Sequence, residues 1–257
     1  MNAMRILALF AHPDDAEFLS AGTLALLAAR GAKIHISTMT AGDCGSTSLS
    51  PSKITRRRKA EAGRASSLIG AAYSCLEEKD LAVFYELSSL RKVMELVRST
   101  EADLVVTHSP VDYMVDHETT SHLAQTACFG AMAPNFRTGA PRAAKPLSAV
   151  PHLYYAAAFG GRDILGTDIP SRIFVDISAT FARKAEMLAC HESQRAFLRA
   201  QQDIQDPLEV QRQMAESAGR AAGVALAEGF RQHLGQGFPK ENRLAQWLPG
   251  LVRVVEI

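Results

Sequence analysis

The fold is decided by the stretch Ile6-Leu7-Ala8-Leu9-Phe10-Ala11-His12-Pro13-Asp14-Asp15. Its uninterrupted apolar run, residues 6–10, is typical of a strand buried on both faces of a parallel sheet. The polar turn that follows at once is typical of a strand-to-helix junction. Working outward, strand-like runs at 34–39, 72–76 and 104–107 alternate with helical stretches at 17–29, 53–69, 88–98 and 117–129. This alternation predicts an α/β fold: a Rossmann-like, mostly parallel sheet with helices on both faces.

The second half of the chain begins with a long loop. Residues 133–151 are rich in proline, glycine, alanine and basic side chains, and long loops in compact domains are often functional. Beyond it we expect strands at 152–155 and 173–176, helices at 179–198 and about 206–230, and a final strand within 248–257. We therefore predict a single domain, residues 1–257, with a C-terminal helical extension from about residue 200.

Composition excludes several classes of function. Lys and Arg total 28 and Asp and Glu total 27, so the charge supplies no field for nucleic acid or an anionic membrane. The basic cluster Arg56, Arg57 and Lys59 is typical of a solvated helix face. Four widely spaced cysteines form no C-x-x-C pair, which argues against a thiolate zinc site or a disulfide framework. The first apolar run is too short for a signal peptide, and none approaches the roughly 20 residues of a membrane span. We expect a cytoplasmic protein.

His12 and Asp15 are candidate metal ligands. Ligands bind parallel sheets at the carboxyl ends of the strands, where these two residues fall. Zinc accepts both imidazole nitrogen and carboxylate oxygen, and Asp14 would then face the open coordination position. The alternative is that Asp14 or Asp15 only caps the following helix, with Pro13 at its start.

A catalytic zinc ion usually has three protein ligands and a site for water. The third ligand is predicted to be His117, because the segment 112–117 follows the expected strand 104–107 and should open at the same edge. Asp116, its neighbour, could orient the imidazole from behind.

These residues resemble the LmbE-like or PIG-L deacetylases, zinc-dependent enzymes that deacetylate N-acetylglucosaminyl lipids, pseudo-disaccharides and related glycosides. The similarity covers most of the chain and follows the family's order. It is carried by His-Pro-Asp-Asp at 12–15, Thr40-Ala41-Gly42-Asp43, Arg58-Lys59-Ala60-Glu61-Ala62, Lys79-Asp80-Leu81, Asp116-His117, Val175-Asp176-Ile177-Ser178 and His191-Glu192-Ser193-Gln194. The resemblance implies an LmbE-like fold and amide hydrolysis.

The resemblance also implies roles for single residues. His12, Asp15 and His117 match the metal ligands, Asp14 the general base and Asp116 the carboxylate behind a ligand. Arg58 and Asp80 match positions that hold sugar hydroxyls, with a surface ion pair or a helix cap as the alternative for each. The implied cofactor is one divalent metal, zinc or iron(II). The implied partner is a small N-acetylated glycoside, with no nucleic acid and no membrane span, and homo-oligomers are compatible with it.

One position departs from the family. Many members carry His-Pro-Asp-His, whose first histidine stabilises the oxyanion or acts as acid, whereas this chain has Met114 there. Tyr113, His108 and His191 are candidates to replace it, and Tyr113 comes first because the family uses a nearby tyrosine. We predict a zinc-dependent de-N-acetylase. The alternatives are a non-catalytic metal-containing protein that binds small molecules on the same scaffold, and a nucleotide-binding domain, which the absence of G-x-G-x-x-G disfavours.

Overall fold

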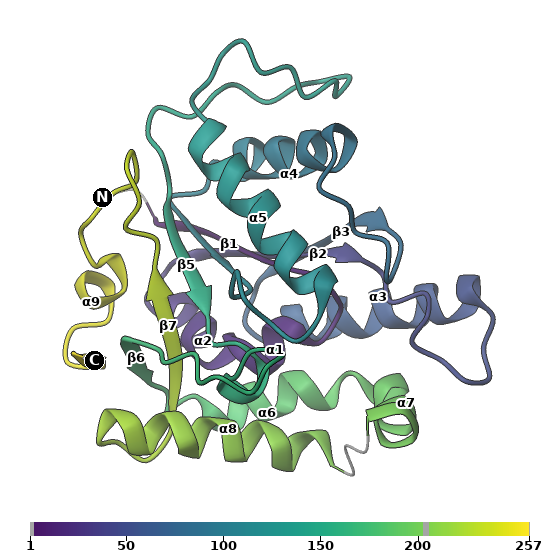
Figure 1. Ribbon diagram of the computed structural model, residues 1–257, viewed down its shortest axis with the longest axis vertical. Helices are drawn as coiled ribbons and strands as arrows, with labels where there is room; N and C mark the ends of the chain where they lie inside the picture. The colour runs from purple at the N-terminus through teal and green to yellow at the C-terminus, as the bar shows by residue number, and fades with distance from the viewer. Residues whose placement is uncertain (1–2, 203–205, 257) are drawn as a thin grey trace.

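A computed structural model describes residues 3–202 and 206–256 as one eight-stranded sheet between helical layers (Figure 1). The strand order is β3-β2-β1-β4-β5-β7-β6-β8. The strands are β1 Arg5–Phe10, β2 Lys33–Thr40, β3 Ala72–Glu78, β4 Leu104–Thr107, β5 His152–Ala156, β6 Ile173–Asp176, β7 Ala227–Gln232 and β8 Val252–Val254. The helices are α1 Asp15–Leu19, α2 Ala21–Ala29, α3 Pro51–Ser67, α4 Leu87–Ser99, α5 Val115–Gly130, α6 Phe181–Ala189, α7 Glu192–Gln202, α8 Pro207–Ala222 and α9 Arg243–Trp247, with a 3₁₀ turn η1 at Phe159–Gly161.

Strand β1 lies inside the sheet and is buried on both faces. It pairs in parallel with β2, Ile6 opposite Ile34, and with β4, Ile6 opposite Leu104. Because side chains alternate along a strand, Ile6 and Phe10 belong to one apolar core and Leu7 to the other. The mostly parallel sheet predicted from this apolar run is confirmed, with antiparallel pairing only where β7 and β8 join.

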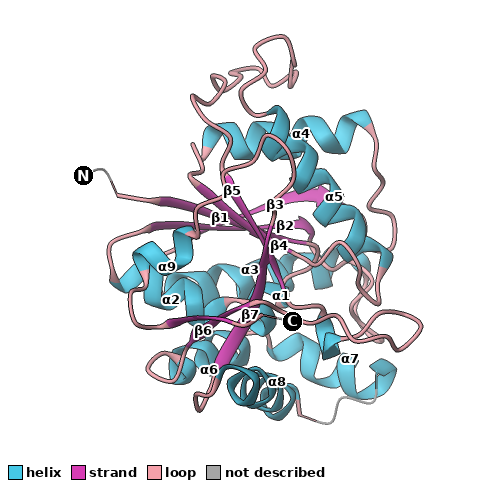
Figure 2. Ribbon diagram, turned by 60° about the vertical axis from the view of Figure 1, so that its left-hand side comes forward, coloured by secondary structure: helices cyan, strands magenta, loops and turns pink. Residues whose placement is uncertain are grey.

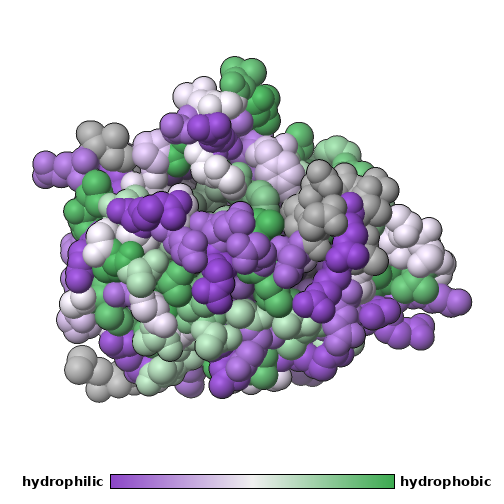
Figure 3. All heavy atoms as spheres, turned by 90° about the horizontal axis from the view of Figure 1, so that it is seen from below, coloured by the Kyte–Doolittle hydropathy of each residue, from purple (hydrophilic) through white to green (hydrophobic). Residues whose placement is uncertain are grey.

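The two helical layers are visible on opposite sides of the sheet in Figures 1 and 2. Helices α4 and α5 pack on the face that Leu7 and Leu9 enter. Helices α1, α2, α3, α6 and α8 contribute to the core on the other face. Seen from below, hydrophilic and hydrophobic side chains are interspersed over the surface (Figure 3). No helix in the described part of the chain is long and apolar enough to cross a membrane.

The expected helix 17–29 is interrupted at Ser20, which ends α1 and precedes α2. A buried ion pair, Lys184 with Glu228 (Nζ to Oε1 2.6 Å), lies at this break. The lysine donates to the carbonyl of Phe18 at the end of α1, and the glutamate accepts from the amides of Gly22 and Thr23 at the start of α2. Cation and anion thus complement the two helix ends that meet there.

The expected helix 206–230 is wrong in its second half. Gly223 has φ 68°, the left-handed conformation that ends many helices, so α8 stops at Ala222. The chain then returns as β7, which inserts between β5 and β6. The C-terminal part is therefore not a purely helical extension, because β7 and β8 complete the sheet. The expected helix 179–198 is likewise two helices, α6 and α7, and Ile257 lies outside the described residues.

Candidate metal centre and active site

The loop after β1 brings two candidate ligands together before α1 begins. The carboxylate of Asp15 accepts a hydrogen bond from the backbone N–H of His12 (2.7 Å), which closes the turn. Asp15 Oδ2 lies 3.4 Å from His12 Nδ1, and Asp15 Oδ1 lies 3.6 Å from His117 Nε2. One ligand atom from each of these three residues lies within 4.8 Å of the others. The structure therefore brings the predicted ligands to one point.

Each histidine ring is held by its own carboxylate. His117 Nδ1 lies 2.9 Å from Asp112 Oδ1, and His12 Nε2 lies 3.2 Å from Asp116 Oδ2. If each of these nitrogens donates, the lone pair of the opposite nitrogen faces the Asp15 carboxylate. Carboxylate–histidine–metal arrays of this kind fix both tautomer and ring orientation.

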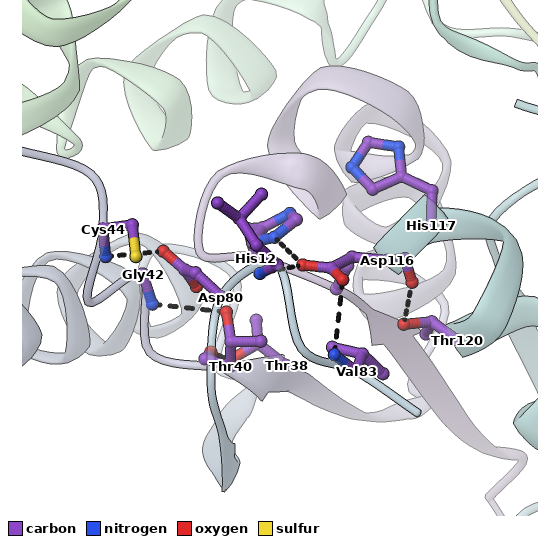
Figure 4. A network of polar contacts seen from close by, with 12 residues as sticks. His12, Thr38, Thr40, Gly42, Cys44, Asp80, Val83, Asp116, His117 and Thr120 are labelled. Atoms are coloured by element: carbon purple, nitrogen blue, oxygen red, sulfur yellow. Dashed lines mark hydrogen bonds and ion pairs between the residues drawn. The ribbon is translucent and has the colours of Figure 1, made fainter. Parts of the chain in front are cut away.

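The partner of Asp116 differs from the sequence expectation. Asp116 was expected to orient its neighbour His117, but its carboxylate turns to His12 (Figure 4). Asp112 supports His117 instead. The reason is the helix: Asp116 and His117 are consecutive in α5, so their side chains point in different directions. The carboxylate of Asp116 also accepts from the amides of Leu81 and Val83, which fastens the loop after β3 to the centre.

The charge around the three ligands suits a cation. Burial lowers the pKa of His12, but the carboxylates of Asp116 and Asp15 outweigh burial and raise it to about 10. Burial raises the pKa of Asp15, but His117 and His108 outweigh burial and hold it well below its usual range. A buried centre with surplus carboxylates and two imidazoles fits one divalent metal with nitrogen and oxygen ligands, such as zinc or iron(II).

Asp14 occupies a strained turn beside the ligands. Its φ is 104°, and its side chain makes no cap hydrogen bond to α1, so it is not the helix cap that the sequence left open. Instead it lies 3.3 Å from Arg58 Nη2, which also donates to the carbonyl of Pro13 (2.6 Å). Burial raises the pKa of Asp14 to about 6, against the opposing effect of Arg58. The pKa of this buried carboxyl thus lies above that of an exposed aspartate.

Arg58 is buried in a slot made by two glycines. A Cβ atom at Gly42 would lie 2.1 Å from Arg58 Nη1, and one at Gly45 would lie 2.5 Å from the same atom. Of the rest of the basic cluster, Arg56 and Arg57 are exposed on α3 as expected, whereas Lys59 is partly buried and pairs with Glu77. Asp80 reaches the same region, where its Oδ2 accepts from the amide of Cys44 (2.9 Å).

A cavity of about 440 Å³ opens over the centre. It is lined by His12, Asp14, Asp15, Phe18, Leu19, Cys44, Gly45, Ser46, Thr47, Arg58, Asp80, Leu81, Tyr113, Met114, His117, Phe159, Gln194, Phe197 and Leu198. The set includes every predicted site residue except Asp116, which lies behind His12. The loops after β1, β2, β3 and β4 supply much of this lining, as the parallel-sheet rule predicts, and η1 and α7 supply the rest.

The three candidates for the missing donor differ in access. Tyr113 lines the cavity, is 45 % exposed and meets the His117 ring edge to face at 5.3 Å. His108 is fully buried, stacks on His117 at 3.9 Å and has its pKa lowered to about 4, first by burial and then by His117. His191 is buried 3.5 Å from Glu17. Neither histidine is among the lining residues described above.

Sequence reasoning missed Asp112 and the packing role of Gln194. Asp112 stands in the quoted segment, and two histidine ligands need two supporting carboxylates, so the pair Asp112 and Asp116 was a usable signal. The side-chain amide of Gln194 donates to the carbonyl of Gly45 (3.2 Å) and so joins α7 to the loop that holds Arg58.

Fold and site together describe an α/β protein with a His-Asp-His cluster that could hold a metal ion at the carboxyl edge of a mostly parallel sheet. Residues 7–128, which contain all three ligands, match the family model PIG-L, described as GlcNAc-PI de-N-acetylase. The match spans a little less than half of the chain, and it makes residues 7–128 similar to this family, also called LmbE-like.

Solved structures with the same fold include enzymes of two kinds. The N,N'-diacetylchitobiose deacetylase of Pyrococcus horikoshii is 22% identical, with a TM-score of 0.75 over 90% of this chain and 84% of that one. The 4-carboxy-2-hydroxymuconate hydratase of Pseudomonas putida is 22% identical, with a TM-score of 0.73 over 93% of this chain and 99% of that one. A 4-oxalmesaconate hydratase of Pseudomonas putida is 24% identical over 72% of this chain and 71% of its own length. At these identities the structural likeness shows a shared fold.

Proposed function

We propose that this protein is a metal-dependent amide hydrolase that removes an acetyl or related acyl group from an N-acylated amino sugar or glycoside. The family match supports a hydrolase-type enzyme on this scaffold. The observation that carries the finer proposal is the placement of Asp14, a buried carboxyl beside three metal ligands, at the wall of one cavity. A water molecule and an acyl carbon that enter this cavity would lie next to Asp14 and next to the three proposed metal ligands.

The residues divide the work of hydrolysis. A divalent metal held by His12, Asp15 and His117 would polarise the acyl carbonyl and make water more acidic. Asp14 accepts a proton as the water oxygen bonds to the acyl carbon, and that proton passes to the nitrogen as the C–N bond breaks. Tyr113 donates a hydrogen bond to the carbonyl oxygen as negative charge develops on it. The products are a carboxylate and a free amine.

Polar groups on the cavity wall suit the sugar. Asp80 Oδ1 is buried and has no hydrogen-bond partner among the described residues, so it can accept from a hydroxyl without breaking another contact. Arg58 offers donors from the same wall, although its Nη2 already serves Asp14 and Pro13. These contacts support the two residues as the sugar-binding pair.

The hydratase relatives make water addition to a carbon–carbon double bond the rival reaction. One of them is a hydratase of 4-carboxy-2-hydroxymuconate, a polycarboxylate whose negative charges are best matched by cationic side chains. Arg58 is the only lysine or arginine among the lining residues that the structure describes, and Asp14 already neutralises it. A neutral N-acyl sugar therefore suits the cavity better than a polyanion.

Metal content and turnover test the proposal together. Purified protein should hold about one divalent ion per chain, and His12→Ala or Asp15→Ala should remove it, because each variant deletes one of three ligands. Elemental analysis measures this, with His122→Ala, an exposed histidine of α5, as the matched control.

The metal-loaded protein should release acetate from a panel of N-acetylglucosaminides and should not hydrate 4-carboxy-2-hydroxymuconate. Retention of metal in both ligand variants would show that the centre is misassigned. Hydration without deacetylation would replace the proposed reaction. Metal binding without either reaction would leave a small-molecule binding protein, the outcome that Met114 suggests.

A further inference from the structure

A row of aromatic rings leads away from the metal centre along the cavity wall. The ring of Tyr113 lies 5.3 Å from that of His117 at an interplanar angle of 87°. Phe159 lies 5.8 Å from Tyr113, and Phe18 lies 5.6 Å from Phe159 at 78°. Tilted and edge-to-face contacts at these separations are favourable, so the rings support one another. The row, defined here as Tyr113, Phe159 and Phe18, forms a continuous apolar wall.

Other apolar side chains widen this wall. Leu19 of α1 and Phe197 and Leu198 of α7 line the same cavity. Phe18 is only 6 % exposed and Leu198 only 8 %, so the helices fix these side chains in place. The polar lining is built elsewhere, where Arg58 and Gln194 meet the loop at Gly45.

Two glycines that follow Phe159 help to place its ring at the cavity. Phe159 opens the 3₁₀ turn, and the two residues after it, Gly160 and Gly161, have φ of 74° and 70°. Glycine adopts this left-handed conformation at no steric cost, so the chain reverses directly after the ring. The residues farther along this loop, Ile164 and Leu165, are 76 % and 85 % exposed, whereas Phe159 faces the cavity.

Resting on the proposed hydrolase function, we propose that the substrate carries a large apolar group, a ring or a chain of at least about four carbons, that lies along this aromatic wall. Tyr113, the first ring of the row, contacts the His117 ring, whereas Phe159 and Phe18 follow it in turn. A cavity of about 440 Å³ is of the size that holds a drug-sized ligand. Transfer of an apolar group from water to this wall is favourable because it buries apolar surface. The group is either the acyl chain or the aglycone of the sugar.

Three substrates distinguish these sources on the metal-loaded enzyme. Methyl N-acetylglucosaminide is the reference, phenyl N-acetylglucosaminide carries an apolar aglycone, and methyl N-octanoylglucosaminide carries an apolar acyl chain. Burial of one CH₂ group is worth about fourfold in binding. We therefore expect kcat/KM for one of the extended substrates to exceed the reference by at least about tenfold. The better substrate identifies the source, and equal kcat/KM for all three overturns the inference.

Two variants test whether the wall causes the preference. Phe159→Ala should reduce the ratio of extended to reference kcat/KM to below about threefold, and Phe197→Ala should reduce it in the same direction. Phe84→Ala is the matched control, because Phe84 is 62 % exposed and does not line the cavity. A preference that survives both cavity variants, checked for folding by thermal unfolding, also overturns the inference.

The inference can fail separately from the hydrolase proposal. If no amide is cleaved, calorimetry of the same three uncleaved amides still measures apolar binding. Tighter binding of an extended amide that is lost in Phe159→Ala would support the wall while hydrolysis is rejected. Equal binding of all three amides would overturn the wall itself.

Discussion

At the scale of single residues, the strained backbone of Asp14 is the feature that most distinguishes the site. A φ of 104° is unfavourable for a residue with a side chain, and such strain costs on the order of 1–3 kcal/mol. The strain points the carboxyl toward Arg58 and the cavity instead of toward the amides of α1. The backbone therefore directs this carboxyl into the cavity, where the proposed general base would lie, and leaves the end of α1 without a side-chain cap.

Asp14→Asn isolates that role. Asparagine tolerates left-handed backbone about as well as aspartate, so the turn and the metal should be retained while the proton acceptor is lost. We expect kcat to fall by about 10²–10⁴-fold at matched metal content. Asp168→Asn, an exposed residue paired with Arg162, is the control. Wild-type turnover in Asp14→Asn would exclude this residue as the base.

Tyr113→Phe tests the donor that stands next to Met114. Burial raises the pKa of Tyr113 above its usual range, so its hydroxyl stays protonated and able to donate at neutral pH. Loss of one oxyanion donor costs about 10²–10³ in kcat, and the metal should remain. Steady-state kinetics should show this for Tyr113→Phe and not for Tyr85→Phe, whose hydroxyl contacts Thr126. Unchanged kcat would make His108 and His191 the next candidates for the oxyanion donor.

At the scale of elements, the break between α1 and α2 is stabilised by charges brought from distant parts of the chain. Lys184 comes from α6 and Glu228 from β7, and each completes its hydrogen bonds on a helix end. Gln211 of α8 adds a hydrogen bond to the carbonyl of Glu17 (2.9 Å). The short helix that begins with Asp15, a proposed metal ligand, is thus held at its far end by α6 and α8.

Lys184→Met should lower the free energy of unfolding by about 3–5 kcal/mol, because it leaves the carboxylate of Glu228 buried without its cation. Urea denaturation of the metal-free protein measures the effect. The neighbouring Arg183→Met removes an exposed pair with Glu186 and should cost less than about 1 kcal/mol. Equal losses in the two variants would mean that the buried pair does not stabilise the break.

The same break shows where sequence reasoning succeeds and where it stops. The strands at 104–107 and 173–176 were predicted to the residue, because apolar runs between turns are local signals. The interruption at Ser20 was not predictable, since residues 17–29 read as one amphipathic helix and the capping Glu228 is more than 200 residues away. Strand β7 was hidden for a similar reason, because Ala227 to Phe230 continue the composition of α8.

The same contrast between local signals and long-range contacts applies to the site. The motif at residues 12–15 and His117 predicted the residues that the structure brings together. The exchange of Asp112 for Asp116 behind His117 depends on how the loop before α5 folds, and neighbouring positions in sequence do not reveal that. The cavity's aromatic wall joins α1, the segment before α5 and η1, which only the tertiary structure places side by side.

At the scale of the whole molecule, a nearly neutral protein concentrates carboxylates around one buried point. In the metal-free protein the pKa of His12, about 10, exceeds the ordinary 6.5, so its proton contributes stability below pH 6.5 that is lost as pH rises through 10. A metal must displace this proton, because only the neutral imidazole binds it.

Metal affinity should therefore rise with pH, becoming about tenfold tighter per unit between about pH 6.5 and 8.5, as one proton is released per ion. Competition with a chelator of known affinity measures the slope. Calorimetry in two buffers of different ionisation enthalpy counts the proton directly. An affinity independent of pH over this interval would show that His12 is already neutral before the metal binds.

The open sheet also leaves two edges where another polypeptide could add a strand. At one edge β3 ends with Glu77 and Glu78, and its register with β2 shifts between Thr38 and Thr40. At the other edge β8 is three residues long and carries exposed Arg253 at its centre. Charges, a bulge and a short strand all disfavour edge-to-edge pairing. Both edge strands therefore disfavour aggregation of the folded protein through added β-strands.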